Sequence, residues 1–488
     1  MSAPFWSPED LRQMESLSIP PAEVERQIGL FKNPPAFARL ARPAALGDGI
    51  QRIAPGDQKA LLAFYDRARE AGRLSKFVPA SGAATRMFQS LLRLFREGHT
   101  RREDLQKKSA AGDSEALGAL LLMDSLPQVA FYGELAHCLG AQGLDLRALL
   151  AQGDYAKVWD CLLFEAGLGY GARSKGLIRF HGYAAGARTA LEEHFWEALG
   201  TVRDAQRICR IHFTVSPEHR ADYEKAVAQL LPALGSRGQF KIDFSEQEKS
   251  QQTLAVDLDN RPFRDAKGRL VFRPAGHGAL IGNLDRLGAD IVFIKNIDNV
   301  VIERLLEPTL EWKKLLAGYL LSVQSGIFSL LESLEKDPEA VAEALAFVEA
   351  RWGPAATAGA RALSRTEQKK WLVRFLDRPL RVCGVVPNTG EPGGGPFWVE
   401  GRDGELSLQI IEGAQVDPES DAQKAVFGRS THFNPVDLVC AVSDRHGRPY
   451  NLKSYVDEAA VFISRKSHQG RELKALELPG LWNGAMAG

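Results

Sequence analysis

Two patterns of hydrophobic and polar residues occur along this chain, one typical of helices and one typical of strands. Apolar residues recur at helical spacing in "GDQKALLAFYDRAREAG" (56–72). Short apolar runs rich in β-branched and aromatic residues follow later, in "RICRIHFTV" (207–215), "QFKIDF" (239–244) and "IVFIK" (291–295). Because these runs alternate with helical segments, the pattern predicts an α/β fold with a mainly parallel sheet flanked by helices.

The same pattern divides the chain into three parts. Residues 1–75 are typical of helices broken by prolines. Residues 76–378 alternate between strands and helices, with a helical insertion at about 88–170 and helices again from 302. Residues 379–488 are rich in apparent strands and in glycine. We therefore expect a helical N-terminal region, an α/β domain and a β-rich C-terminal part.

Composition narrows the classes of partner. The 488 residues include 61 Lys and Arg and 61 Asp and Glu, so the formal net charge is zero. A protein that binds nucleic acid or an anionic membrane usually carries a basic excess, so we expect neither partner. Five scattered cysteines predict reduced thiols, and the start of the chain has no secretory pattern. The apolar runs such as "ALGALLLM" are too short to cross a bilayer. These features together predict a cytoplasmic protein, and they leave the oligomeric state open.

Small residues mark a strand-to-helix turn in "FVPASGAATRM" (77–87). The turn and the helix start consist of Ser81, Gly82, Ala83, Ala84, Thr85 and Arg86. Small side chains let a backbone approach a ligand closely, and a helix N-terminus offers free N–H groups to an anion. A tight turn without a ligand explains the same residues.

A second stretch, 268–301, combines a glycine turn with an acid after a strand. The turn is Pro274-Ala275-Gly276-His277-Gly278, and the strand ends in Lys295-Asn296-Ile297-Asp298-Asn299. An acid at the carboxyl end of a strand is able to hold Mg²⁺ together with phosphate oxygens. Helix capping and turn formation are the alternative roles for such residues. Ligands of α/β sheets bind outside the carboxyl ends of the strands, and 79–87, 216–219, 244–248 and 295–299 all fall there.

These motifs, in this order, resemble those of nucleotide-sugar pyrophosphorylases, above all the UDP-glucose and UDP-N-acetylhexosamine enzymes. The likeness extends over about residues 76–440 through "SGAATRM", "SKG" (174–176), "FSEQ" (244–247), "PAGHG", "NIDN" and "IIEGAQ" (410–415). The chain as a whole is similar to a bacterial family of unknown function with the same motif order. The resemblance implies a Rossmann-like, GT-A-like nucleotide-diphospho-sugar transferase fold. It also implies transfer of a nucleotidyl group from a nucleoside triphosphate, with UTP preferred, to a sugar 1-phosphate.

The resemblance further implies a role for each matching residue. Arg86 and Lys175 would be catalytic, neutralising phosphate charge, and Asp298 would carry Mg²⁺ as the cofactor. Nucleotide-binding residues would be Ser81, Gly82, Ala83, Ala84, Thr85, Gln247, Gly276, His277 and Gly278. Sugar-binding residues would be Asn296, Glu412 and Asn434, although a structural turn explains the segment around Asn434 as well.

The chain also departs from the pattern of these enzymes. Ser81 and Ala84 stand where the signature has glycine, and Ser174 stands where it has proline. A C-terminal Phe-x-Pro-x-Lys stretch is missing, so Lys453 or Lys466 would have to replace its lysine. Two other functions remain open for these reasons. One is a nucleotide-sugar-dependent glycosyltransferase, for which "DLD" (257–259) is the only Asp-x-Asp motif. The other is a nucleotide-sugar-binding protein without catalysis.

Overall fold

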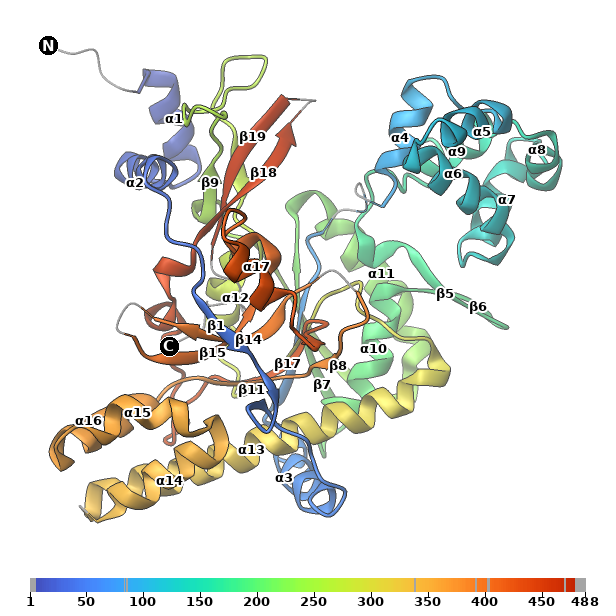
Figure 1. The fold of residues 1–488 in the computed structure, drawn as a ribbon. Helices are drawn as coiled ribbons and strands as arrows, with labels where there is room; N and C mark the ends of the chain where they lie inside the picture. Colours follow the sequence, from blue (N-terminus) through green and yellow to red (C-terminus); the bar gives the residue numbers. More distant parts are fainter. Residues whose placement is uncertain are drawn as a thin grey trace, which may run out of the picture.

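The computed structural model describes residues 6–82, 84, 87–337, 339–390, 393–401, 404–468 and 471–478. A mixed six-stranded sheet forms the centre of the molecule (Figure 1). In spatial order its strands are β12 (Leu380–Cys383), β17 (Asp437–Ala441), β11 (Ile291–Lys295), β4 (Leu74–Pro79), β7 (Ile208–Val215) and β8 (Gln239–Glu246). The predicted α/β class is therefore confirmed, and so are the strands expected near 207, 239 and 291.

The direction of the strands defines one functional edge of this sheet. Strands β11, β4, β7 and β8 are parallel to one another, and β17 runs antiparallel to both β11 and β12, so β12 is the fifth strand with the same direction. The carboxyl ends of the five parallel strands therefore lie at one edge, together with the start of β17. We call this the carboxyl edge, and it is where open α/β sheets bind ligands.

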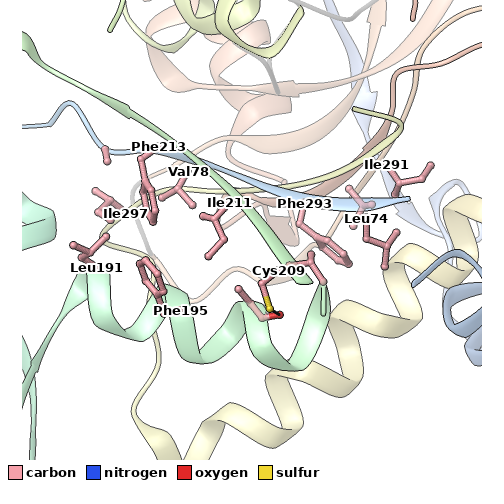
Figure 2. Close-up of a cluster of buried hydrophobic side chains, with 14 of the residues drawn as sticks. Leu74, Val78, Leu191, Phe195, Cys209, Ile211, Phe213, Ile291, Phe293 and Ile297 are labelled. Atoms are coloured by element: carbon pink, nitrogen blue, oxygen red, sulfur yellow. Dashed lines mark hydrogen bonds between the residues drawn. The ribbon is translucent and has the colours of Figure 1, made fainter. Parts of the chain in front are cut away.

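Two long helices, α10 (Ala190–Thr201) and α13 (Leu306–Lys336), cover one face of the sheet. Figure 2 shows Leu191 and Phe195 of α10 directed at the strand side chains. Phe195 stacks on Phe213 of β7 with ring centres 6.0 Å apart. Side chains alternate along β11, so Phe293 enters this core while Ile294 enters a second core on the opposite face. Both faces of the sheet are thus buried.

Helix α13 is the longest element and lies in the core. Residues Glu303–Lys336 have the length and hydropathy of a membrane span, contrary to the expectation that every apolar run is too short, but 56% of that window is buried inside the protein. Helix α3 (Gln58–Glu70) packs so closely on α13 that a Cβ at Gly318 would overlap the carbonyl oxygen of Leu61. Helices follow α13 as predicted, namely α14 (Ala340–Trp352), α15 (Ala358–Arg361) and α16 (Arg365–Leu376).

Six helices between β4 and β7 form a bundle with a hydrophobic core of its own, which Figure 1 shows projecting from the sheet. We call this the helical bundle. Its helices are α4 (Gln89–Arg96), α5 (Arg102–Ala110), α6 (Ser114–Ser125), α7 (Tyr132–Ala141), α8 (Leu146–Gln152) and α9 (Ala156–Leu163). A ribbon of β5 (Arg179–Tyr183) and β6 (Gly186–Thr189) and then α10 follow it, and α11 (Arg220–Leu234) lies between β7 and β8.

The C-terminal part is built from small sheets that also recruit the N-terminal region. A three-stranded sheet pairs β1 (Leu40–Pro43) with β14 (Gly395–Glu400) and β15 (Leu406–Ile411). The N-terminal region is therefore not helical throughout, because β1 joins a sheet whose other strands lie more than 350 residues later. Helices α1 (Pro8–Ser16) and α2 (Pro21–Lys32) pack on a core that also includes the C-terminal hairpin.

The remaining elements are short. They are β2 (Ala45–Leu46), β3 (Gly49–Ile50), β9 (Gln252–Leu254), β10 (Phe272–Pro274), α12 (Ile281–Asp285), β13 (Val386–Pro387), α17 (Asp421–Phe427), β16 (His432–Phe433) and the hairpin strands β18 (Phe462–His468) and β19 (Arg471–Glu477). All five cysteines are free thiols, in agreement with the expectation from their spacing.

Candidate functional site

The carboxyl edge joins the ends of β4 and β11. The backbone N–H of Ile297 donates to the carbonyl oxygen of Pro79 at 3.0 Å. Two stretches that are more than 200 residues apart in the sequence are therefore fastened to each other. The small-residue turn after β4 and the "NIDN" loop after β11 share one site.

The "SKG" segment follows the helical bundle in the sequence and contacts this site. The N–H of Lys175 donates to the carbonyl oxygen of Gly82 at 3.1 Å. The Ser174 hydroxyl is buried, lies 2.7 Å from the Tyr223 hydroxyl and donates to the carbonyl oxygen of Ala80 at 3.2 Å. A Cβ at Gly176 would overlap the Tyr223 hydroxyl. Each residue of the segment thus makes a specific contact. Ser174, which stands where the signature has proline, is held by two hydrogen bonds of its hydroxyl.

Lys175 and Asp298 form an ion pair across the site. The Lys175 ammonium lies 2.6 Å from Asp298 Oδ2, and the side chains are 26% and 36% exposed. The two residues that the sequence assigns to phosphate and to Mg²⁺ are therefore in contact and remain accessible to a ligand.

Two predicted ligand residues carry polar atoms without partners. Gln247 Nε2, which follows β8, and Asn296 Oδ1, which follows β11, are buried and form no hydrogen bond within the described part of the chain. Such orphaned groups are costly unless a ligand or water completes them. Both atoms are therefore suited to a bound molecule.

The small-residue turn itself is described only in part. Ala83, Thr85 and Arg86 lie outside the described residues. Ser81 and Gly82 follow β4 at the surface, whereas Ala84 is buried and donates its N–H to the carbonyl oxygen of Arg173 at 2.9 Å. Ala84 therefore does not offer a free N–H to a phosphate, contrary to the expected role of the turn at that position.

The glycine turn after β10 has the backbone that only glycine adopts readily. Gly276 has φ +77°, and a Cβ there would overlap Oε2 of Glu477 from the C-terminal hairpin. His277 and Gly278 open the short 3₁₀ helix η7 (His277–Leu280), which leads into α12. The packing of Glu477 accounts for glycine at 276 in addition to the predicted approach of a base.

Glu412 and Asn434 are each next in the sequence to a residue that lines one cavity of about 310 Å³. The cavity is lined by Asn388, Gly393, Gly395, Phe397, Gly413, Phe427, Ser430 and Phe433. Glu412 caps the 3₁₀ helix η10 (Gly413–Gln415), and Asn434 Nδ2 donates to the carbonyl oxygen of Gly384 at 2.6 Å while its Oδ1 accepts from the N–H of Val436. Asn434 is 3% exposed, so it holds the turn between β16 and β17.

Five charged side chains lie buried beneath the site, between the sheet and α10 and α13. This buried charge cluster consists of Lys76, Glu197, Lys295, Lys313 and Asp437. Glu197 accepts from Lys76 and from Lys295, each at 2.7 Å, and Lys313 lies 2.5 Å from Asp437. Three ammonium groups face two carboxylates, so the cluster leaves positive charge beneath the carboxyl edge.

The pKa values in the cluster follow from burial and from this imbalance. Burial lowers the pKa of Lys76 to about 8, although Glu197 opposes the shift. Burial alone would raise the pKa of Glu197, but Lys295, Lys313 and Lys76 together bring it well below its usual value. Burial also lowers the pKa of His194 far below its usual value. The His194 ring is therefore neutral, and its Nε2–H donates to the carbonyl oxygen of Ile297 at 3.1 Å, next to Asp298.

The sequence analysis missed the cluster and the tie from His194 to the site. Lys76 in "LSKFVP" and Lys295 in "IVFIK" are charged residues inside apolar strands, a pattern that indicates a buried partner. The partners come from α10, α13 and β17, which no local pattern connects to these strands.

The number of acidic side chains near the site limits how many ligands the protein could give to a metal ion. The described residues include no group of three or more His, Cys, Asp or Glu side chains placed to hold a metal ion. Asp298 alone fits Mg²⁺ of the kind that takes its other ligands from phosphates and water. In "DLD", Asp257 Oδ1 accepts from the N–H groups of Asp259 and Arg261, so this motif forms a turn.

Comparison with known proteins places the chain in a family. A family model described as "domain of unknown function (DUF4301)" matches residues 7–488, so the chain belongs to that family. No curated protein matches the sequence.

Solved structures of two enzymes are similar at low identity. The UDP-N-acetylglucosamine pyrophosphorylase from Trypanosoma brucei, in complex with an inhibitor, is 13% identical, and the match covers 96% of this chain and 63% of that enzyme with a TM-score of 0.38. The UDP-glucose pyrophosphorylase from Leishmania major is 12% identical, and the match covers 96% of this chain and 71% of that enzyme with a TM-score of 0.39. This chain therefore spans less than two thirds of the trypanosomal enzyme, and likenesses at such scores leave activity and substrate open.

Proposed function

We propose that this protein is a nucleotidyltransferase that makes a nucleotide sugar and pyrophosphate from a nucleoside triphosphate and a sugar 1-phosphate. The observation that carries the proposal is the accessible Lys175–Asp298 pair beside Gly82 at the carboxyl edge. A cation for phosphate and a carboxylate for a divalent metal stand together where α/β sheets bind ligands. The resemblance of the motifs favours UTP as the triphosphate, and the choice of base is tested separately.

The reaction is a displacement at phosphorus. An oxygen of the sugar 1-phosphate forms a bond to the α-phosphorus while the bond from that phosphorus to the bridging oxygen of the β-phosphate breaks, and pyrophosphate leaves with those electrons. Such transfers require alignment and charge neutralisation more than a protein nucleophile. The site accordingly needs cations and backbone donors, and no cysteine takes part.

The residues of the chain divide these tasks. Lys175 neutralises charge on the phosphates as its ammonium turns from Asp298 to the substrate. The N–H groups of Ser81 and Gly82 are positioned by β4 to meet phosphate oxygens. Asn296 Oδ1, which lacks a partner within the described residues, accepts a hydrogen bond from a sugar hydroxyl.

Asp298 is the residue that would hold Mg²⁺. The metal, when bound with the triphosphate, supplies positive charge that offsets the charge of the phosphate oxygens. The chain's own contribution is to fix the carboxylate. Ile297 is bonded to Pro79 through its N–H and to His194 through its carbonyl oxygen, so the neighbouring Asp298 has a defined position.

The cavity of about 310 Å³ beside Glu412 is the place for the sugar in this proposal. One hydrogen bond links the segment that carries Asp298 to the segment after the cavity residue Phe433, because Asn299 Nδ2 donates to the carbonyl oxygen of Pro435 at 2.7 Å. Phe427 and Phe433 offer ring faces on which the apolar face of a pyranose packs.

The test is a pyrophosphate-release assay over the four nucleoside triphosphates and a panel of sugar 1-phosphates, with Mg²⁺ present. We expect release with at least one pair. Lys175→Met and Asp298→Asn should each lower kcat at least 100-fold, the scale of losing one electrostatic contact to the transition state. Lys424→Met and Asp421→Asn are matched controls, because they remove the same charges from an exposed pair on α17. A folded wild-type chain that releases no pyrophosphate with any pair would refute the proposal.

A nucleotide-sugar-binding protein without catalysis is the second candidate. It is favoured by Ala84, whose N–H is already donated to Arg173. Calorimetry with nucleotide sugars separates the two functions. Tight binding without exchange of labelled pyrophosphate would support the second candidate, and exchange would support the first.

A further inference from the structure

The last residue of β19, Glu477, lies on the glycine turn at 276–278, which the resemblance of the motifs assigns to the nucleotide of the proposed reaction. This inference rests on that function. A Cβ at Gly276 would overlap Glu477 Oε2, so the carboxylate occupies the space that a side chain at 276 would fill. Glycine at 276 thus brings a negatively charged oxygen directly against the turn.

Strand β18 of the C-terminal hairpin holds Glu477 through one carboxylate oxygen. Ser464 donates its hydroxyl to Glu477 Oε1 at 2.9 Å, and the Lys466 ammonium lies 3.0 Å from the same oxygen. The next residue, Leu478, donates its N–H to the carbonyl oxygen of Ala275 at 3.0 Å. The hairpin is therefore fastened to the turn itself, and the carboxylate has one orientation.

Only one oxygen of this carboxylate is engaged. Oε1 accepts from Ser464 and lies beside the Lys466 ammonium, whereas no hydrogen bond reaches Glu477 Oε2 within the ranges that the structure describes, and the side chain is 16% exposed. A carboxylate oxygen is a pure acceptor and is strongly hydrated when nothing else donates to it. Oε2 is thus a fixed, open acceptor at the turn.

We infer that Glu477 selects the base, and that the preferred base carries an exocyclic amine. The amines of cytosine, adenine and guanine each donate N–H to a carboxylate oxygen. Uracil has a single ring N–H with a carbonyl oxygen on each side, and these oxygens would lie against the charge of Glu477. Uracil nucleotides are therefore the disfavoured substrates.

Gln247 provides the complementary donor. Its Nε2 is buried and without a partner within the described residues. The end of β8 is connected to the helix that follows the glycine turn, because Asn283 Nδ2 of α12 donates to the carbonyl oxygen of Glu246 at 2.9 Å. The amine-bearing bases present an acceptor close to the amine, such as N3 of cytosine, so a donor and an acceptor from the protein match one edge of the base.

The experiment compares CTP and UTP, which differ only at position 4 and the adjoining ring nitrogen. Binding of each to the full chain is measured by calorimetry with Mg²⁺. We expect CTP to bind at least 10-fold more tightly than UTP, because a site that hydrogen-bonds one donor rejects the analogue that lacks it. In Glu477→Gln, which removes the charge and keeps the shape, this ratio should fall below about 3-fold, since the amide also donates to a carbonyl oxygen. Adenosine and guanosine triphosphates show which amine-bearing base binds most tightly.

Glu472→Gln is the matched control, because Glu472 lies on the same strand with its side chain exposed. It should leave the ratio unchanged. The inference is overturned if wild type binds UTP as tightly as CTP, or if Glu477→Gln keeps the wild-type ratio. Should Glu477→Gln fail to fold, the wild-type ratio alone decides. Absence of binding by any triphosphate to the folded wild type refutes the proposed function, and this inference with it, which distinguishes the two failures.

Discussion

Gly176 has no room for a side chain, although its backbone conformation is ordinary. A Cβ there would overlap the Tyr223 hydroxyl and lie 2.8 Å from Tyr223 Cζ and 2.9 Å from Ile297 Cγ1. We predict that Gly176→Ala lowers the free energy of unfolding by about 1–3 kcal/mol, because overpacking displaces a buried ring. Urea denaturation followed by circular dichroism measures this change.

Two further variants test the cause. Gly182→Ala on β5 should be nearly neutral, since a Cβ there meets nothing within 4 Å. In a double-mutant cycle, Tyr223→Phe removes the hydroxyl and should make Gly176→Ala less costly than it is in the wild type. Additive losses would show that contact with Tyr223 is not the cause.

The numbers of positive and negative groups in the buried charge cluster predict how two substitutions change the free energy of unfolding. Lys76→Met leaves two ammonium groups facing two carboxylates, whereas Glu197→Gln leaves three ammonium groups facing one. We expect Glu197→Gln to cost about 3–5 kcal/mol, as for other broken buried pairs, and Lys76→Met to cost clearly less. The lowered pKa of Lys76, about 8, agrees with a cation that is poorly compensated.

Urea denaturation at pH 7 measures both variants. Lys424→Met serves as the control for removing a lysine, because it is half exposed. If Lys76→Met costs as much as Glu197→Gln, the net charge of the cluster does not set its stability.

The candidate site shows which of its features the sequence predicts and which it does not. Asp298 and Gln247 were predicted in segments at the ends of strands, and parallel strands bring their carboxyl ends to one edge. Lys175 was predicted only from the resemblance of the "SKG" segment. The contact between Lys175 and Asp298 was not predictable, since it depends on how the helical bundle returns the chain to Gly82. The cap formed by Glu477 was not predictable either, because the pairing of β18 with β19 does not reveal where the hairpin docks.

A buried acid, Asp10, helps to hold helix α1 against the rest of the protein, and its ionisation makes this contribution depend on pH. Asp10 caps the helix through Ser7 and accepts from Arg264 at 2.8 Å and 2.9 Å, and its side chain is 3% exposed. The hydrogen bond from Arg264 lowers the pKa of Asp10 to about 2, against burial. The folded protein therefore keeps Asp10 ionised at pH values where the unfolded chain takes up a proton.

We predict that Asp10→Asn costs about 1 kcal/mol at pH 7, a value reduced for the exposure of Arg264. Because the pKa of Asp10 is lowered, this contribution is fully present above its ordinary value of 3.8 and is lost as the pH falls toward 2. The difference in unfolding free energy between wild type and variant should thus shrink as the pH falls from about 4 to 2. A difference that stays constant over this range would contradict the role of the charge.

Elements are predictable where the pattern is local and strong. Strands β7, β8 and β11 stand out because each is a short apolar run followed by a turn. Strand β1, "LARP", has no such pattern and forms because β14 offers it an edge. Its presence depends on a partner more than 350 residues away, so the N-terminal region appeared to be helical throughout.

The order of the sheet is a property of the whole molecule. Strand β17 inserts between β11 and β12, and it runs against both. A C-terminal segment, expected only to complete the sugar site, therefore also contributes strands to the sheet of the α/β domain predicted at 76–378. The boundary at 379 does not separate two cores, because Leu438 and Val439 of β17 enter the cores on opposite faces of the sheet.

The helical bundle, by contrast, has a core separate from that of the sheet, so we predict that it loses stability independently. Leu135 and Trp159 are fully buried in the bundle, and Trp159 donates its indole N–H to the sulfur of Met123 at 3.2 Å. Leu135→Ala should cost about 2–5 kcal/mol within the bundle, because it leaves a cavity. Native-state hydrogen exchange of the full chain should show weaker protection in α4 to α9 and unchanged protection in β11.

Leu191→Ala on α10 is the matched variant, since Leu191 is equally buried against the sheet. It should weaken protection in β4, β7 and β11 and leave the bundle unchanged. The bundle is connected to the site by the two segments that carry Gly82 and Lys175, which the N–H of Lys175 joins to each other. Loosened bundle helices with an intact Lys175–Asp298 pair would therefore leave nucleotide binding in place. If Leu135→Ala weakens protection equally in the bundle and in β11, the two cores unfold as one unit and the bundle is an inseparable part of the domain.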